Sequence, residues 1–195
     1  LTEWGIECTY HALQCFGGHG YIAEHGMEQL ARDARITTLY EGTTGIQALD
    51  LIGRKTAVSQ GAGLKLFLAD VEQFIAANAG NPAVAEFLPV LGAKAKEWGE
   101  LTVDVLQGAA TNPEELGAAS WDYLFYSGYV ALAYWWARSV AAAQASAQPE
   151  SFKQAKLETA RFYYARLLPR TLTHAASMQS GAEPLMAMDA ARFGE

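Results

Sequence analysis

The chain has 195 residues, of which 51% are hydrophobic and 18% are charged, and its 14 basic and 21 acidic residues give a formal net charge of −7. This balance excludes intrinsic disorder, because the chain carries enough apolar surface to bury a core. It also disfavours nucleic acid as a partner, since a net acidic chain repels phosphate groups. The two cysteines, Cys8 and Cys15, are too few for a disulfide-stabilised secreted domain, so we expect reduced thiols and a cytoplasmic protein.

The uncharged stretch of most note covers residues 123–137, which is fifteen residues. A membrane-spanning helix needs about 20 apolar residues, so the sequence predicts a buried helix here and no membrane span. The N-terminus lacks the basic and then apolar pattern of a signal peptide. It opens inside a predicted helix without an initiator methionine, so we expect this chain to be a fragment of a longer protein.

Helical spacing dominates the first part of the chain, which we expect to form one domain over residues 1–58. Apolar residues predict a helix over 1–15, and the glycines of Gly17-Gly18-His19-Gly20 end it. A second helix is predicted from Met27 to Ile36 and a third from Ile46 to Val58, with a turn over 40–45 between them. Residues 59–63 are a flexible linker by composition.

Residues 64–195 are predicted to form a second domain, an antiparallel four-helix bundle. Asn81-Pro82 and Asn112-Pro113 each combine a helix cap with a proline suited to a first helical turn. Pro169 is expected to kink or end the fourth helix. One side of the third helix is apolar and carries Trp121, Leu124, Phe125, Gly128, Leu132, Trp135 and Trp136. The aromatic cluster of the same helix is predicted to lie in the bundle core and comprises Tyr123, Phe125, Tyr126, Tyr129, Tyr134, Trp135 and Trp136. No strand pattern appears, so the predicted fold class is all-α.

Three sequence blocks carry the candidate chemistry. The first runs Gln14-Cys15-Phe16-Gly17-Gly18-His19-Gly20-Tyr21, the second Arg32-Asp33-Ala34-Arg35-Ile36, and the third Leu39-Tyr40-Glu41-Gly42-Thr43-Thr44-Gly45-Ile46-Gln47. In this order and spacing they resemble the C-terminal helical domain of the acyl-CoA dehydrogenase family. The later helices resemble the extra helical domain of longer bacterial members, of the methylmercaptopropionyl-CoA dehydrogenase type.

The resemblance implies flavin-dependent α,β-dehydrogenation of an acyl-CoA thioester, an oxidoreductase reaction of fatty-acid metabolism. It assigns the catalytic base to Glu41 and places Tyr40 and Gly42 at the acyl-CoA site. A carboxylate is chemically suited to this role, because desolvation raises its pKa and strengthens it as a base. The family also transfers its electrons to a separate acceptor.

The resemblance further implies FAD as cofactor, with Thr43, Thr44 and Gly45 touching the flavin. Gln14, Cys15, Phe16, Gly17 and Gly18 match residues that contact the FAD of a neighbouring subunit, which implies a homodimer or a dimer of dimers. Position 19 departs from the family, since His19 stands where many members have asparagine.

The residues 1–195 lack the family's N-terminal helical and middle β domains, which supply most flavin and substrate contacts, so we expect this fragment alone to bind no FAD and to be inactive. An alternative hypothesis is a stand-alone helical interaction or oligomerisation module without catalytic activity. The four histidines are not spaced as metal ligands, so we expect no metal site.

Overall fold

The computed structural model describes residues 1–194, and the all-α prediction is confirmed, since that part of the chain holds helices and turns but no strand. Contacts along the chain divide it into two compact units, one of residues Leu1–Ala48 and one that begins at Leu49. Each unit has its own buried residues.

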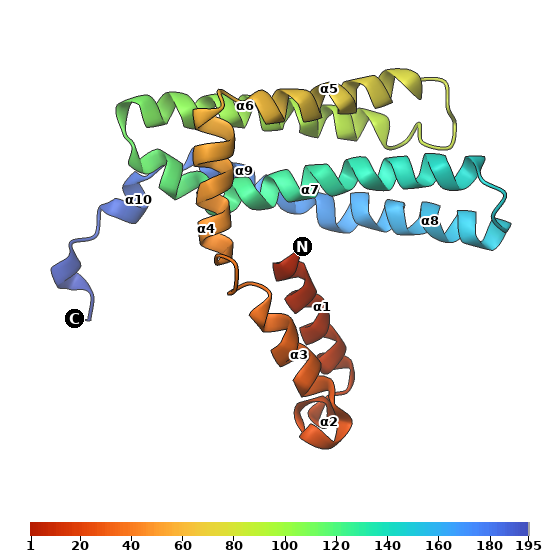
Figure 1. The fold of residues 1–195 in the computed structure, drawn as a ribbon, viewed down its shortest axis with the longest axis horizontal. Coiled ribbons are helices and arrows are strands. Elements are labelled where there is room, and N and C mark those ends of the chain that lie inside the picture. The colour runs from red at the N-terminus through yellow and green to blue at the C-terminus, as the bar shows by residue number, and fades with distance from the viewer. Residues whose placement is uncertain (195) are drawn as a thin grey trace. The chain divides into compact units, whose positions relative to one another are not determined.

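The first unit is built on two packed helices, α1 (Thr2–Cys15) and α3 (Met27–Ile36) (Figure 1). The predicted bounds of both helices are confirmed. The glycine-rich segment after α1 also contains a short helix, α2 (Gly18–Tyr21), followed by a single 3₁₀ turn at Ala23–His25. Ile6 of α1 and Ala31 of α3 are buried where the two helices meet.

The predicted third helix begins at Thr44 as α4 (Thr44–Leu49) and continues as a π-helical segment, η2 (Asp50–Val58). Within η2 the hydroxyl of buried Thr56 donates to the carbonyl oxygen of Leu51 at 2.8 Å, a bond to a residue five positions back. The predicted flexible linker is shorter than expected, because Ser59–Gly61 form a turn and α5 already begins at Ala62.

The second unit is a bundle of long helices in which neighbours run in opposite directions (Figure 1). Helix α6 packs against α5 and α7, and α7 packs against α8 and α9. The elements of the bundle are α5 (Ala62–Ala77), α6 (Leu88–Thr111), α7 (Glu114–Ala145), α8 (Glu150–Phe162) and α9 (Thr171–Gln179).

Helix α7 buries a different side from the one the apolar pattern singled out. Tyr123, Tyr126 and Val130 are at most 1% exposed, whereas Trp121 is 44% and Trp135 is 52% exposed. The prediction that Trp135 lies in the core is therefore wrong, and that for Tyr123, Tyr126, Tyr129 and Tyr134 is confirmed. Helix α7 is apolar on all sides, so its periodicity could not decide which side faces its neighbours.

The buried tyrosines of α7 find partners for their hydroxyl groups. The Tyr123 hydroxyl lies 3.1 Å from Thr102 Oγ1, and the Tyr126 hydroxyl donates to Glu97 Oε2 at 2.7 Å. Burial, together with the Glu97 carboxylate, raises the pKa of Tyr126 far above its usual range. A tyrosine offers a large apolar ring and one polar atom that α6 can satisfy, which favours burying this side of α7.

The fourth helix of the bundle is interrupted before Pro169, as predicted. Regular α-helix ends at Phe162, and the chain passes through a π-helical segment, η3 (Tyr163–Leu167), and a 3₁₀ turn, η4 (Leu168–Arg170), before α9 begins. Proline lacks the N–H that would continue an α-helix. The hydroxyls of Tyr163 and Tyr164 donate to the carbonyl oxygens of Tyr129 and Ala133 on α7, each at 2.9 Å, and so hold this segment in place.

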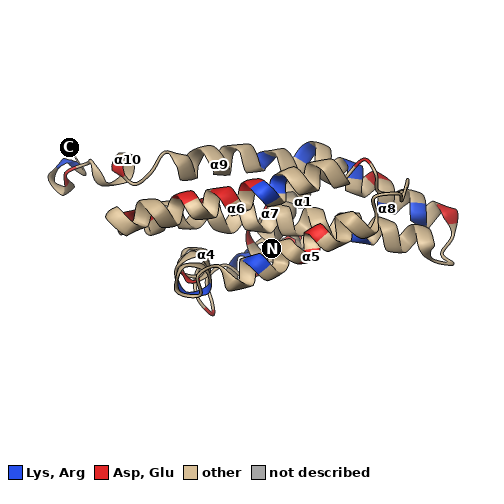
Figure 2. Cartoon of the chain, turned by 90° about the horizontal axis from the view of Figure 1, so that it is seen from above, with Lys and Arg blue, Asp and Glu red and all other residues tan. Residues whose placement is uncertain are grey.

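Charges of both signs are interspersed along the bundle helices (Figure 2). The basic residues of α8 are largely used within the bundle. Arg161 forms a two-pronged ion pair with Glu86, with Nη2 at 2.8 Å from Oε1, and the ammonium of Lys156 lies over the rings of Trp136 and Phe152. The chain then ends in short helical segments, α10 (Glu183–Met186) and η5 (Ala190–Arg192).

Candidate functional site

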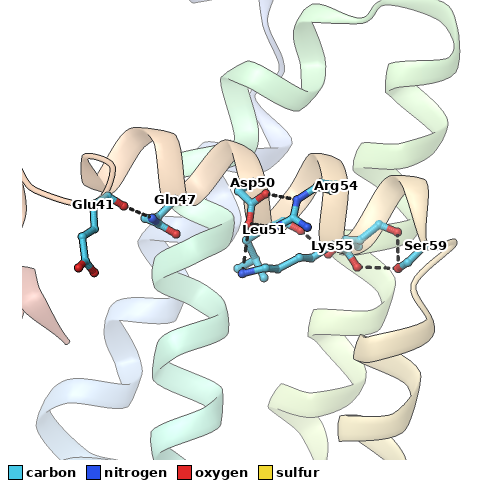
Figure 3. Close-up of polar contacts among 8 residues, drawn as sticks. Glu41, Gln47, Asp50, Leu51, Arg54, Lys55 and Ser59 are labelled. Atoms are coloured by element: carbon cyan, nitrogen blue, oxygen red, sulfur yellow. Dashed lines mark hydrogen bonds and ion pairs between the residues drawn. The ribbon is translucent and has the colours of Figure 1, made fainter.

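The turn between α3 and α4 places Glu41 in an unusual backbone conformation. Glu41 has a φ of +56°, and Gly42 follows with a φ of +94°. A positive φ is strained for an L-residue, and residues of this kind cluster at functional sites. The side chain of Glu41 is exposed and points away from α4 (Figure 3). Glu41 therefore presents a carboxylate on a fixed and strained turn.

Hydrogen bonds fix this turn at both of its ends. The side-chain amide of Gln47 donates to the backbone oxygen of Glu41 at 2.8 Å (Figure 3). Further along, the N–H of Thr44 donates to the carbonyl oxygen of Thr38 at 3.3 Å, and the Thr44 hydroxyl donates to Glu3 Oε1 at 2.5 Å. Glu41 and the first residue of α4 are thus both anchored, the second of them to α1.

The start of α4 offers polar groups that a cofactor could contact. Thr43 is exposed, and its hydroxyl oxygen accepts from the N–H of Ile46 at 3.4 Å. The first N–H groups of a helix have no partner within the helix, and here the N–H of Thr44 donates to Thr38 and that of Ile46 to Thr43, so it is the hydroxyl of Thr43 and the backbone of Gly45 that could meet a ligand. Thr43 and Gly45 therefore fit contacts to a flavin cofactor. The hydroxyl of Thr44 is buried and bonded to Glu3, so Thr44 could reach a ligand only through its backbone.

The second group of predicted cofactor residues lies at the end of α1. Gln14, Cys15, Phe16, Gly17 and Gly18 are all exposed. Gly17 has a φ of +58° and a ψ of −142°, a conformation that L-residues with side chains rarely adopt. The end of α1 thus presents an open surface, available to a ligand or to another chain.

The two predicted cofactor groups do not meet within the first unit. Glu3 bonds Thr44 at the first turn of α1, whereas Gln14 and Cys15 lie at the last turn of the same helix. A helix of 14 residues is about 20 Å long. The Glu41 turn and the 14–18 segment therefore lie at opposite ends of the α1–α3 pair (Figure 1).

Tyr40 and Gly42, the predicted substrate-site residues, flank Glu41. Tyr40 is 53% exposed. A Cβ atom added to Gly42 would lie 2.9 Å from Nε2 of Gln47, so no other residue fits here without moving that amide. The structure thus brings Tyr40, Glu41, Gly42 and Thr43 together on one turn.

Two polar residues that follow this turn in the chain, Gln47 and Asp50, were not singled out from the sequence. Gln47 is the last residue of the third sequence block, 39–47, but nothing in its spacing indicated a bond to Glu41. Asp50 in η2 pairs with Arg54, Nε to Oδ1 at 2.6 Å, and with Lys55, Nζ to Oδ2 at 3.1 Å (Figure 3). The hydrogen bond from Arg54 and that from Lys55 lower the pKa of Asp50 to about 2. Its four-residue spacing from Arg54 could have predicted this pair.

Neither a metal cluster nor a membrane span is found in the described part of the chain. Within residues 1–194, no group of three or more His, Cys, Asp or Glu side chains is arranged to hold a metal ion. No helix among the same residues has both the length and the apolarity needed to cross a membrane.

Comparison with known proteins covers both units. Residues 1–56 match a family described as acyl-CoA dehydrogenase, C-terminal domain. Residues 67–189 match a family described as acetyl-CoA dehydrogenase C-terminal like, which accounts for more than half of the chain. The chain belongs to the acyl-CoA dehydrogenase family. The family resemblance predicted from the three sequence blocks is thereby confirmed.

Relatives of this chain include three bacterial enzymes. A 3-methylmercaptopropionyl-CoA dehydrogenase of Ruegeria pomeroyi is 34% identical over 175 residues, which is 86% of this chain and 29% of the relative. A butyryl-CoA dehydrogenase of Syntrophomonas wolfei is 32% identical over 83% of this chain and 27% of its own length. The broad-specificity linear acyl-CoA dehydrogenase FadE5 of Mycobacterium tuberculosis is 29% identical over 93% of this chain and 32% of its own length. This chain thus spans about a third or less of the length of these relatives.

Proposed function

We propose that this chain is the C-terminal part of a flavin-dependent acyl-CoA dehydrogenase in which Glu41 is the catalytic base. The observation that carries the proposal is the backbone of Glu41, whose strained positive φ is held in place while its carboxylate faces outward. Relatives named as dehydrogenases of butyryl-CoA and 3-methylmercaptopropionyl-CoA support an acyl-CoA thioester as the substrate class.

In this proposal the carboxylate of Glu41 accepts the α proton of the acyl-CoA thioester. FAD, when bound, would supply the redox chemistry, the acceptance of a hydride from the substrate. Removing a weakly acidic proton needs a base held close to it and out of water. Glu41 is exposed in this chain, so the surfaces that exclude water are assigned to the rest of the enzyme and to the substrate.

The neighbours of Glu41 are assigned to the substrate. Gly42 has no side chain, so a thioester could approach the backbone closely at this turn. The backbone N–H of Glu41 would help bind the oxygen on which charge develops, because a donor fixed in advance stabilises the transition state. The exposed ring of Tyr40 lies next to the turn and is assigned to the acyl-CoA site.

The two cofactor groups are assigned to different subunits. Thr43, Thr44 and Gly45 would contact FAD bound beside Glu41, whereas Gln14, Cys15, Phe16, Gly17 and Gly18 would contact FAD of a neighbouring subunit. The placement of the groups at opposite ends of α1 supports this assignment. It implies a homodimer or a dimer of dimers, which passes its electrons to a separate acceptor.

We further propose that residues 1–58 complete the family's C-terminal helical domain and that residues 64–195 are an appended bundle. The separate family matches to 1–56 and to 67–189 support this division. Because the chain covers about a third or less of its relatives, the fragment alone is expected to bind no FAD and to be inactive. A flavin absorbance band of near-stoichiometric intensity in the purified fragment would contradict this expectation.

Replacing the base in the complete enzyme tests the proposal. Glu41→Gln keeps the size of the side chain but removes its basicity, so kcat with an acyl-CoA substrate and a dye acceptor should fall by at least about 10²–10⁴-fold. Glu24→Gln changes an exposed glutamate of the same unit and should leave kcat unchanged. Flavin absorbance shows whether each variant retains FAD. Near-normal turnover of an FAD-loaded Glu41→Gln enzyme would refute the assignment.

A further inference from the structure

Gln47 lies in α4, six residues after Glu41, and reaches back to it. Its side-chain Nε2 donates to the backbone oxygen of Glu41 at 2.8 Å, and Gln47 is itself placed by its N–H, which donates to the carbonyl oxygen of Thr43 at 2.9 Å. Gln47 is therefore bonded through its side chain to the proposed base residue and through its backbone to the first turn of α4.

The strained backbone of Glu41 and Gly42 is held by a hydrogen bond from a side chain outside the turn. Glu41 and Gly42 have consecutive positive φ values, of +56° and +94°, and the first of them is disfavoured for an L-residue. The bonds of Thr44 to Thr38 and Glu3 hold the α4 end of the turn, whereas the amide of Gln47 holds Glu41 itself. This amide also packs against Gly42, where an added Cβ would approach Nε2 to 2.9 Å.

We propose that Gln47 is a positioning residue that aims the carboxylate of Glu41. The direction of the Cα–Cβ bond of Glu41 depends on its φ and ψ, and the bond from Gln47 fixes the carbonyl that follows them. Figure 3 shows the consequence, since the side chain of Glu41 is directed away from Gln47 while its backbone oxygen faces that residue. Loss of this bond would remove the restraint that Gln47 places on the peptide between Glu41 and Gly42.

This inference rests on the proposed role of Glu41 as the base. A displacement of about 1 Å in a catalytic group is enough to cost about 10²-fold in rate. The effect should fall on the proton-removal step and not on substrate binding, because Gln47 acts through the backbone of the base. A residue that merely stabilised the unit would instead lower FAD occupancy or thermal stability.

The test compares Gln47→Leu with Gln29→Leu in the complete, FAD-loaded enzyme. Gln29 is exposed on α3, so its variant controls for the loss of a glutamine from the same unit. Gln47→Leu should lower kcat by about 10–100-fold and leave KM within about threefold. The kinetic isotope effect with an α-deuterated acyl-CoA should rise, because proton removal becomes more rate-limiting. Gln29→Leu should change neither quantity.

The isosteric variant Gln47→Glu provides a second test in case the leucine variant loses its cofactor. Its ionised carboxylate cannot donate to the Glu41 oxygen, so at pH 8 it should show the same loss of kcat. Normal kcat in either FAD-loaded variant, or loss of FAD from both, would overturn the inference. Glu41→Gln separates the two proposals, since an inactive Glu41→Gln enzyme beside a normal Gln47→Leu enzyme refutes only the role of Gln47.

Discussion

At the scale of single residues, two glycines of the first unit illustrate different requirements. Glycine is needed at position 42 because φ is positive there and because the amide of Gln47 leaves no room for a Cβ atom. Gly20 is needed for space, because a Cβ atom there would lie 2.5 Å from the carbonyl oxygen of Leu13 and 2.9 Å from Cβ of Phe16. The end of α1 and the short helix α2 are thus packed too closely to admit any side chain at Gly20.

We therefore expect Gly20→Ala to destabilise the first unit by about 1–3 kcal/mol, the usual cost of forcing an extra methyl group into a closely packed contact. Gly5→Ala is the matched control, because Gly5 lies within α1 and an added Cβ there meets nothing within 4 Å. The control should be neutral or stabilising by up to about 1 kcal/mol, since alanine favours helices. Urea unfolding followed by circular dichroism measures both changes, and equal stability of the two variants would contradict the packing argument.

At the scale of elements, the end of α9 is fastened to the start of α7 by one carboxylate. Glu115 Oε1 accepts from the backbone N–H of Ala182 at 3.2 Å and from Nδ2 of Asn112 at 3.3 Å. Ala182 is 1% exposed, so its N–H has little access to water. Gly181, with a φ of +72°, makes the turn that brings this N–H to the carboxylate. Glu115 thus closes the bundle at a point 67 residues distant in sequence.

Glu115→Ala should lower the free energy of unfolding by about 1–3 kcal/mol, because it leaves the buried N–H of Ala182 without its acceptor. Glu114→Ala serves as the control. Both glutamates lie in the first turn of α7 and interact similarly with the helix dipole, but Glu114 is exposed. Thermal or chemical unfolding should show a clearly larger loss for Glu115→Ala, and matched losses would show that Glu115 acts only through the helix dipole.

At the scale of the whole molecule, the two units differ in how much apolar surface they bury. The buried hydrophobic residues of the first unit are Ile6, Ala31 and Ala48, of which two are alanines. The second unit buries a long series of aromatic and branched side chains along α6 and α7. Each large apolar side chain that is fully buried contributes about 1.5–3 kcal/mol, so the bundle carries most of the stability of the chain.

We expect this difference to appear as unequal hydrogen exchange in the chain of residues 1–195. Amides of α1 and α3 should exchange through low-energy local opening, whereas those of α6 and α7 should exchange only with near-global unfolding of the bundle. Native-state hydrogen exchange followed by mass spectrometry measures this directly. Equal protection of α1 and α7 would show that the first unit is stabilised by something other than its own core.

The turn that carries the candidate site residues was predictable from the sequence. Glycines and helical spacing marked the ends of α1 and α3, and the motif around Glu41 indicated the family, because these signals are local or depend on a fixed order of residues. The bond from Gln47 to Glu41 was not predictable, since spacing along the chain does not show where a side-chain amide turns back. The roles of Gln14 to Gly18, Tyr40 and Thr43 to Gly45 stay predictions, as they depend on FAD and substrate.

The sequence by itself determined that the chain is all-α, where α1 and α3 begin and end, and to which family it belongs. Only the tertiary structure decided which side of α7 is buried, because that helix is apolar all round and the outcome depends on where its tyrosine hydroxyls find partners on α6. The same holds for the separation of the two proposed cofactor groups along α1 and for the strained turn at Glu41. Each of these depends on contacts between residues distant in sequence or on backbone angles, which no local pattern encodes.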